Sequence, residues 1–151
     1  MLELACPGDL KEVNRLAREV HEMHISWRPD IYTMPEELYP AERFQAAVQA
    51  RELYVAKEGG QVCGYVAVRI RETAAPGLVP RRVMLVDELC VDEPFRNQGI
   101  GSQMMAEVRI LARAFRCTDL QLGVYPQNDE AVAFYQKCGF MIQSITMQRK
   151  V

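Results

Sequence analysis

The stretch that decides the fold is DELCVDEPFRNQGIG, residues 87–101, in which an apolar strand-like run ends at a loop with an arginine and two glycines. An apolar helix-like run follows directly. Glycine lets a backbone approach a ligand closely, and the unpaired amides at a helix N-terminus attract anions. The junction RNQGIG, residues 96–101, is therefore a candidate site for an anionic group such as a diphosphate.

Three phosphate-binding interpretations of this junction compete with a simple tight turn. A P-loop requires G-x-x-x-x-G-K-[ST], but Gly101 is followed by Ser102 and Gln103. A dinucleotide-binding loop requires G-x-G-x-x-G near the first strand and helix, but Met104 occupies the third glycine position and hairpin strands come first. The third interpretation is an arginine-led R-x-x-G-x-G loop that opens a long helix. The surrounding sequence decides between it and the turn.

The periodicity of apolar residues predicts strands and helices on both sides of the junction. The predicted strands cover residues 2–6, 52–58, 61–71, 82–91, 119–124 and 140–148. The predicted helices run from an Asp9 cap through His24 and over residues 40–50, 99–116 and 128–138. Gly59 and Gly60 suit a two-residue hairpin turn, and Gly139 suits a left-handed helix C-cap. This order predicts an α+β fold of three α/β/α layers, with helices on both faces of a mixed, largely antiparallel sheet.

Composition limits the classes of function. The chain has 151 residues, 49% hydrophobic and 25% charged, without a repeat or linker, so residues 1–151 are expected to form a single globular domain. The net charge is −2 and there is no basic block, which disfavours a nucleic-acid partner. No run resembles a signal peptide or a membrane span, so no membrane association is expected. The five cysteines form no C-x-x-C pair, which favours free thiols and a cytoplasmic location.

Two adjacent acids, Asp87 and Glu88, interrupt the apolar strand that precedes the junction. Strict alternation would place Asp87 on one face of the strand with its odd-numbered neighbours and Glu88 on the other face. No single solvent-facing side can hold both carboxylates, so at least one must face a wet cleft, have a buried partner, or lie at a strand irregularity. The structural alternative to a catalytic acid is an ion pair with Arg81, Arg82 or Arg96.

The stretch at residues 87–101, with its following helix, resembles the main acyl-CoA-binding motif of the GNAT superfamily of N-acetyltransferases. Downstream, LGVYPQNDEAVAFYQKCGF, residues 122–140, resembles the second motif of that superfamily, including its N…A…FY…GF skeleton. The predicted order of strands and helices is also similar to that fold. The resemblance implies a GNAT-like fold and acetyl-CoA as the cosubstrate. It does not identify the acceptor, because the region before Arg81 matches only in outline.

The resemblance implies roles for particular residues. The glycine loop would hold the coenzyme A pyrophosphate, mostly through backbone amides; it comprises Arg96, Asn97, Gln98, Gly99, Ile100, Gly101 and Ser102. The backbone of Leu89, Cys90 and Val91 would pair with the pantetheine arm as if it were another strand. Asn128 would contact the pantetheine, and Tyr135 would lie near the thioester sulfur.

Acetyl transfer to an amine requires a deprotonated amine, a polarised carbonyl and a stabilised leaving thiolate. We expect Glu88 to act as the base, with Asp87 as the alternative. Asn128 and Tyr135 lie two helical turns apart on one helix face. This spacing alone favours a tyrosine packed in the core, whereas the resemblance makes Tyr135 the expected general acid. An acyl-accepting Cys90 is disfavoured, because free cysteines are usually buried as small hydrophobes.

The acceptor-binding region is expected on the first helix and the loop after it, because these elements shape the acceptor cleft in the superfamily. The candidates are His24, Trp27, Arg28 and Tyr32. His21 and His24 are three residues apart, but no further cysteine or histidine cluster supports a metal, so none is expected.

We expect direct acetyl transfer within a ternary complex, to a primary amine of a small molecule or a protein. The alternative is a non-catalytic acyl-CoA sensor, which would need neither Tyr135 nor the acidic pair. A homodimer is compatible with the resemblance, because dimers are common among relatives.

Overall fold

The computed structural model describes residues 2–151, which contain five strands and four α-helices. The strands are β1 (Leu2–Leu4), β2 (Leu53–Glu58), β3 (Gln61–Thr73), β4 (Arg81–Val91) and β5 (Asp119–Leu122). The α-helices are α1 (Leu10–Trp27), α2 (Ala41–Gln49), α3 (Ile100–Ala114) and α4 (Asp129–Lys137). Short 3-10 helices lie at η1 (Pro7–Asp9) and η2 (Glu93–Phe95). These elements confirm the predicted helices and every predicted strand except the last.

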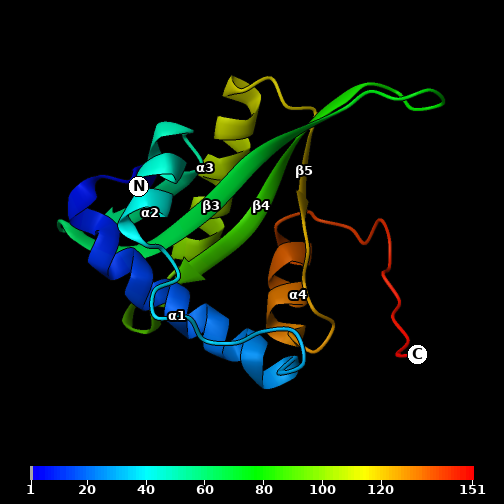
Figure 1. Ribbon diagram of the computed structural model, residues 1–151. Coiled ribbons are helices and arrows are strands. Elements are labelled where there is room, and N and C mark those ends of the chain that lie inside the picture. The colour runs from blue at the N-terminus through cyan, green and yellow to red at the C-terminus, as the bar shows by residue number, and fades with distance from the viewer. Residues whose placement is uncertain (1) are drawn as a thin grey trace.

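The five strands form one mixed sheet in the order β1-β2-β3-β4-β5 (Figure 1). Neighbouring strands are antiparallel except β4 and β5, which are parallel and are joined by the crossover helix α3. Gly59 and Gly60 take φ angles of 56° and 83° in the turn between β2 and β3, as the hairpin prediction requires. Gly139 follows α4 with a φ of 90°, which confirms the predicted left-handed cap.

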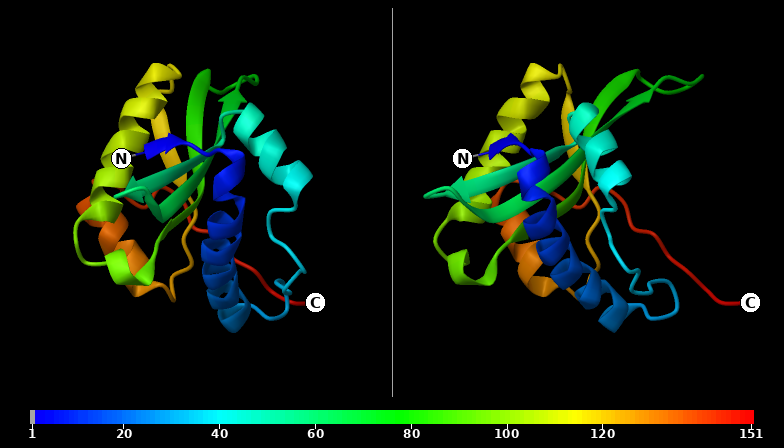
Figure 2. Two further views of the ribbon diagram at one scale, coloured as in Figure 1. Left: turned by 90° about the vertical axis from the view of Figure 1, so that its left-hand side faces the viewer. Right: turned by 60° about the vertical axis from the view of Figure 1, so that its left-hand side comes forward.

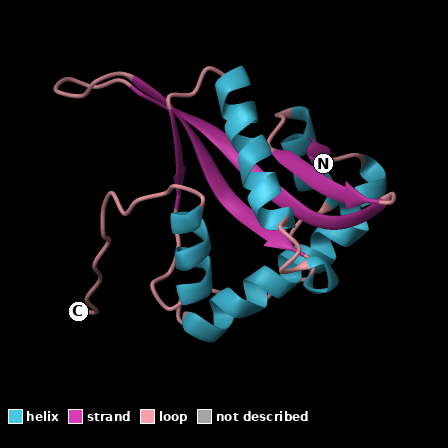
Figure 3. Ribbon diagram, turned by 180° about the vertical axis from the view of Figure 1, so that it is seen from behind, coloured by secondary structure: helices cyan, strands magenta, loops and turns pink. Residues whose placement is uncertain are grey.

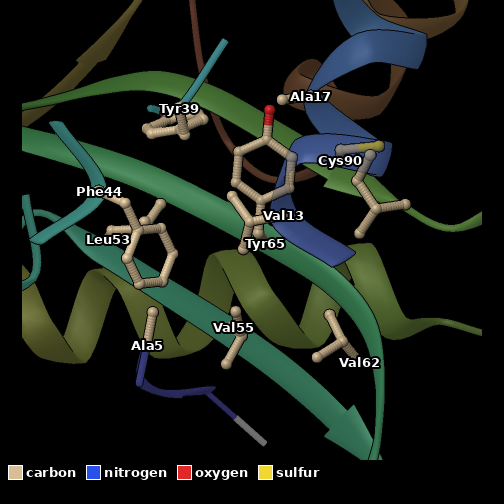
Figure 4. Packing of buried hydrophobic residues seen from close by; sticks show 11 residues of the cluster. Ala5, Val13, Ala17, Tyr39, Phe44, Leu53, Val55, Val62, Tyr65 and Cys90 are labelled. Carbon is tan, nitrogen blue, oxygen red and sulfur yellow. The ribbon is translucent and has the colours of Figure 1, made fainter. Parts of the chain in front are cut away.

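Helices cover both faces of the sheet, so the predicted α+β fold of three layers is confirmed (Figure 2). Helices α1 and α2 pack on one face through Val13, Leu16, Ala17 and Phe44 (Figure 4). Helix α3 packs on the opposite face through a buried set that includes Met104, Met105, Val108 and Ala112, and α4 adds partly buried residues beside it. None of the helices within residues 2–151 combines the length and the apolar character needed to cross a membrane.

The predicted strict alternation along β4 is wrong after Val86, because the strand contains a β-bulge. Ala67 pairs with Glu88 and Val68 pairs with Val86, which leaves Asp87 as the extra residue on β4. The bulge moves the following residues to the opposite face from the one predicted. Leu89 therefore packs in the same core as Val86, under α3, while Glu88 faces the side that α1 and α2 cover.

The predicted strand over residues 140–148 is also wrong. This segment forms neither a strand nor a helix, and it runs outside the sheet after α4 as an extended loop (Figure 3). An alternating apolar pattern suits a strand, but a strand forms only where a neighbouring backbone edge accepts its hydrogen bonds. No edge within residues 2–139 pairs with this segment.

Asp9 lies at the predicted N-cap position of α1, but its side chain does not cap that helix. One carboxylate oxygen accepts from the Cys6 amide at 2.9 Å, and the other is 3.0 Å from Lys57 Nζ. The Asp9 carboxylate thus joins η1 to β2 rather than satisfying the first turn of α1.

Candidate active site

Strands β4 and β5 lie at one side of the sheet and diverge toward their C-terminal ends (Figure 1). They pair from Val83 to Val86, where β5 ends at Leu122. β4 continues to Val91, paired on its other edge with β3 as far as Gly64. Beyond the bulge, β4 is paired with β3 on one edge only. Its other edge has no strand beside it among the described residues.

In a strand, the N–H and C=O groups of successive residues point to opposite edges, which shows which backbone groups lie on this open edge. The Asp92 amide donates to the Cys63 carbonyl on the β3 side at 2.8 Å, so the backbone groups of Leu89 and Val91 point the other way. Consistent with this direction, Arg96 Nε donates to the Val91 carbonyl at 2.8 Å. The open edge therefore offers backbone donors and acceptors of the kind that an extended ligand pairs with.

The glycine loop leads from this edge into α3. Asn97 and Gly99 take left-handed φ angles of 61° and 84°. The amides of Ile100, Gly101 and Ser102 fall in the first turn, where no carbonyl four residues earlier is available to them. No atom lies within 4 Å of the place where a Cβ of Gly99 would stand. The loop therefore presents unpaired amides at a helix N-terminus with open space beside Gly99, which fits a diphosphate.

The side chains of the loop bind the protein itself. Arg96 Nη2 lies 3.2 Å from Glu19 Oε2 on α1, and Gln98 Nε2 donates to the Pro94 carbonyl at 2.9 Å. Gly101 leaves room for α4, because a Cβ at this position would lie 3.3 Å from the Phe134 ring. The anion-binding capacity of the loop therefore rests on its backbone amides.

Glu88 lies between two tyrosines on the face that α1 and α2 cover. Tyr65 Oη donates to Glu88 Oε2 at 2.6 Å, and Tyr39 Oη donates to the same oxygen at 3.2 Å. The two rings lie near each other in the core (Figure 4). Burial, and next the charge of Glu88, raise the pKa of both tyrosines well above their usual range, so both hydroxyls remain protonated donors. Glu88 is thereby held as an oriented carboxylate.

Asp87 occupies a different environment from its neighbour. It lies exposed at the bulge, and its Oδ2 is 2.6 Å from Arg69 Nε on β3. The ion-pair alternative for the acidic pair thus holds for Asp87, although its partner is Arg69 and none of Arg81, Arg82 or Arg96.

Three of the predicted acceptor-binding residues form one aromatic cluster with Tyr125. The His24 ring stacks on Tyr32 at 5.2 Å and lies 6.0 Å from Trp27 and 5.9 Å from Tyr125. The hydroxyls of Tyr32 and Tyr125 are 2.9 Å apart. Burial, and next the charge of His21, lower the pKa of His24, while the charge of Glu88 opposes this change. The His24 imidazole is therefore neutral at pH 7 and near Glu88.

The fourth predicted acceptor residue, Arg28, is held by other side chains. Arg28 Nε and Nη2 donate to the two carboxylate oxygens of Asp30 at 2.9 and 2.8 Å, and Nη2 also donates to Gln148 Oε1 at 2.7 Å. His21 Nε2 lies 2.8 Å from the Thr33 carbonyl. Within residues 2–151, no group of three or more His, Cys, Asp or Glu side chains could hold a metal ion.

Asn128 and Tyr135 lie at the start and in the body of α4. Asn128 Oδ1 accepts from the Ala131 amide at 3.1 Å and so caps the helix. Tyr135 packs between Phe134 and Phe140, on the sheet face opposite to Glu88. Burial raises the pKa of Tyr135 to about 12, so its hydroxyl stays protonated through the neutral range.

Cys90 lies in the core beneath α1, close to Tyr65 (Figure 4). Burial raises the pKa of its thiol to about 11, so the thiolate required of a nucleophile is scarce at pH 7. The environment matches that of a small buried hydrophobe.

Sequence reasoning missed residues that come from distant segments. Tyr39 and Tyr65 lie 49 and 23 positions from Glu88, so no local pattern links them to the carboxylate. Tyr125 lies inside the second resembling motif and follows a predicted strand, a signal that could have indicated it. The Arg15–Asp92 pair, with Nη2 and Oδ2 2.7 Å apart, was equally invisible.

Comparisons with known proteins identify the family and the fold of this chain. A model of the acetyltransferase (GNAT) family matches residues 17–140. The chain is 30% identical over 86 residues to the L-amino acid N-acetyltransferase AaaT of Escherichia coli strain K12, across 56% of this chain and 49% of that protein. It thus spans about half the length of this curated relative.

Solved structures show the same fold over the full chain. A mutant of the BH1408 protein from Bacillus halodurans superposes with a TM-score of 0.93 at 32% identity, over 100% of this chain and 99% of that one. The aminoglycoside N-acetyltransferase AAC(6')-Iy, in complex with CoA, superposes with a TM-score of 0.72 at 17% identity, again over 100% and 99%. Because the family model matches most of the chain and a relative above 30% identity spans all of it, this chain belongs to the acetyltransferase (GNAT) family.

Proposed function

We propose that this chain is an N-acetyltransferase that transfers the acetyl group of acetyl-CoA to a primary amine within a ternary complex. The observation that carries the proposal is the open edge of β4, which ends at the amide-lined loop before α3. Glu88 flanks this edge on one face of the sheet and Tyr135 on the other. Acetyl-CoA supplies an acetyl group already activated as a thioester.

The loop amides and the open edge are the proposed coenzyme A contacts. The amides of residues 97–102 bind the diphosphate, and the backbone of Leu89 and Val91 pairs with the pantetheine arm. Asn128 contributes its side-chain amide nitrogen, because its Oδ1 is committed to the α4 cap. The family membership and the CoA complex of AAC(6')-Iy support this assignment.

Glu88 is the proposed base. An amine acceptor reaches the protein as an ammonium ion, with a pKa near 10.4 for a lysine-like amine, and must lose one proton before nitrogen attacks the carbonyl carbon. Glu88 accepts that proton directly or through a water molecule; both tyrosine hydroxyls donate to Oε2, so the proton is taken up on Oε1. Its negative charge also favours a cationic acceptor.

Tyr135 is the proposed acid. As the new C–N bond forms and the C–S bond breaks, sulfur leaves as a thiolate that needs a donor. The Tyr135 hydroxyl, protonated at neutral pH because burial raises its pKa to about 12, donates a hydrogen bond or its proton to that sulfur. Direct transfer fits better than an acetyl-cysteine route, because the buried Cys90 thiol is also protonated.

The aromatic cluster is the proposed acceptor-binding surface. The cluster comprises His24, Trp27, Tyr32 and Tyr125, and its member His24 lies near the charge of Glu88. Aromatic rings beside a carboxylate suit a cation attached to an apolar body. Arg28 positions the loop through Asp30 instead of meeting the acceptor.

The test is thiol release from acetyl-CoA across a panel of primary amines, with the Glu88→Gln and Tyr135→Phe variants. Glu88→Gln flattens the acid limb of the rate–pH profile, whereas Asp87→Asn retains it. Tyr135→Phe lowers kcat by about 100-fold and leaves acetyl-CoA affinity within about twofold. Tight acetyl-CoA binding with no thiol release for any amine would favour the acyl-CoA sensor over the enzyme.

A further inference from the structure

A cleft lies at the C-terminal end of α3, whereas the glycine loop lies at the N-terminal end of the same helix (Figure 3). Its volume of about 320 Å³ falls within the roughly 300–1,000 Å³ typical of sites that bind small molecules. The lining residues come from β1, the turn before β2, β2 itself and the end of α3; they are Leu4, Arg51, Tyr54, Leu111, Ala114 and Phe115. Because a helix rises about 1.5 Å per residue, roughly 15–20 Å separate this cleft from the proposed diphosphate contacts.

Most of the cleft wall is apolar. Leu4, Leu111, Ala114 and Phe115 contribute aliphatic and aromatic surface, and the lining residues include no acidic side chain. Leu4 is 38% exposed, and Leu111 and Phe115 are half-buried, so part of this apolar surface remains in contact with water. A molecule with an apolar body would cover that surface and would gain hydrophobic stabilisation by doing so.

Tyr54 brings an unpaired hydroxyl to this apolar cleft. The residue is only 8% exposed, and its hydroxyl makes no hydrogen bond with another residue that the structure describes. No side-chain oxygen or nitrogen in the described part of the chain is both sealed from solvent and unpaired, so the Tyr54 hydroxyl opens onto the cleft that the residue lines. Burial raises the pKa of Tyr54, which keeps the hydroxyl protonated. The cleft therefore contains a hydrogen-bond donor that the protein itself does not use.

Arg51 supplies a positive charge beside this hydroxyl. Its guanidinium forms neither an ion pair nor a hydrogen bond with another residue that the structure describes. The charge of Arg51 opposes the rise in the pKa of Tyr54 that burial causes, so the two groups lie within electrostatic reach of each other. A guanidinium has the planar geometry to bind a carboxylate through two parallel hydrogen bonds. A single cation beside one hydroxyl donor matches a singly charged anion.

The end of α3 does not oppose an anion at this position. The last carbonyls of a helix carry partial negative charge, which would repel one. In α3 these carbonyls have donors: Arg82 Nε donates to the Phe115 carbonyl at 2.8 Å, and the Cys117 amide donates to the Ala112 carbonyl at 2.9 Å. The Arg82 guanidinium adds a second positive charge at this end of the helix.

We propose that this cleft is a second ligand site, which binds a small molecule that carries one carboxylate on an aromatic or aliphatic body. The carboxylate accepts hydrogen bonds from the Arg51 guanidinium and the Tyr54 hydroxyl, and the body packs against Leu111 and Phe115. The site is distinct from the one proposed for acetyl transfer, because it lies at the opposite end of α3 from the glycine loop.

Titration of the isotope-labelled full chain with hydrocinnamate, followed by amide NMR signals, tests the proposal. Hydrocinnamate joins one carboxylate to a phenyl ring, and a ligand of this size should bind with a Kd of about 1 mM. We expect shifts at residues 51, 54, 111 and 115 and none at residues 97–102. The neutral amide of the same acid should bind at least about tenfold more weakly, because it cannot form the charged pair with Arg51.

Arg116 provides a matched control for Arg51. Each arginine follows the end of a helix with a φ of 58°, but Arg116 does not line the cleft. Arg51→Gln should weaken hydrocinnamate binding at least about tenfold, whereas Arg116→Gln should retain the wild-type affinity. Equal losses in the two variants, equal binding of the acid and its amide, or shifts confined to residues outside the cleft would each overturn the proposal, and so would the absence of any shift at about 10 mM, ten times the expected Kd.

Discussion

At the scale of the residue, the two tyrosine hydroxyls that donate to Glu88 determine how its carboxylate is oriented. Tyr65 and Tyr39 hold one oxygen without placing a positive charge beside it, so the carboxylate is oriented and still attracts a cation. In Tyr65→Phe the ionised carboxylate loses its shorter hydrogen bond. The acid limb of kcat/KM therefore moves to higher pH by about one to two units, since a bond to a charged group contributes roughly 1.5–3 kcal/mol.

Tyr54→Phe is the matched control for this variant. Tyr54 is also a buried tyrosine, but it packs in the core on the opposite face of the sheet and does not contact Glu88. A pH–rate profile measured for both variants should shift only for Tyr65→Phe. An equal shift in the two would mean that loss of a buried hydroxyl, and not its bond to Glu88, moves the limb.

Gly99 allows a second residue-scale prediction, because Gly60 has nearly the same conformation far from the site. Their φ angles are 84° and 83°, and a Cβ would meet no atom within 4 Å at either position. Alanine at either glycine lowers the free energy of unfolding by about 1–2 kcal/mol through backbone strain alone. Isothermal titration should show weaker acetyl-CoA binding only for Gly99→Ala; equal weakening in Gly60→Ala would separate the loop from the diphosphate.

At the scale of the element, Gly64 sets how closely α3 approaches the sheet. A Cβ at Gly64 would lie 2.6 Å from the Cys90 carbonyl and 3.1 Å from Met104 Sδ, so β4 and α3 both have to shift in Gly64→Ala. We expect a loss of about 1–3 kcal/mol in the free energy of unfolding, measured by urea denaturation. Gly123→Ala, where a Cβ meets nothing within 4 Å, should change it by under about 0.5 kcal/mol. Similar losses in both would contradict a packing cause.

Elements were predictable from the sequence where a local pattern decides the structure. Apolar periodicity located the four helices, and Gly59 with Gly60 located the hairpin, because these features depend on neighbouring residues. The bulge at Asp87 was not predictable, since it depends on how β4 registers with β3. Likewise, the pattern over residues 140–148 could not reveal that this segment pairs with no strand of the sheet.

The same distinction between local and long-range determinants applies to the candidate site. The glycine loop and the start of α4 were recognisable because each is one continuous stretch of sequence. The choice between Asp87 and Glu88 was not, because it depends on Arg69, Tyr65 and Tyr39, which only the folded chain brings to the acids.

At the scale of the whole molecule, charged side chains join α1 to the segment that leads into the glycine loop. Arg15 holds both carboxylate oxygens of buried Asp92 at 3.1 and 2.7 Å, and Arg15 also contacts Glu19, which lies 3.2 Å from Arg96. The network connects the acceptor-side helix to the proposed coenzyme A loop. Its contribution to stability should therefore depend on the ionisation of Asp92.

The hydrogen bond from Arg15 is the main cause that lowers the pKa of Asp92 below its usual 3.8, and partial burial opposes it. An acid with a lowered folded-state pKa stabilises the fold above its unfolded-state pKa, and this contribution disappears as pH falls through the folded-state value. Asp92→Asn should reduce the free energy of unfolding by about 1–2 kcal/mol at pH 7, because Arg15 remains partly solvated. The gap from wild type should close below about pH 3.8. Urea denaturation from pH 7 to pH 2.5 measures both values.

Asp119→Asn is the control, because it removes an exposed ion pair with Arg81 at 3.7 Å; it should lower the free energy of unfolding by under about 0.5 kcal/mol. A gap for Asp92→Asn that stays constant with pH would mean that Asp92 stabilises α1 through packing rather than through its charge.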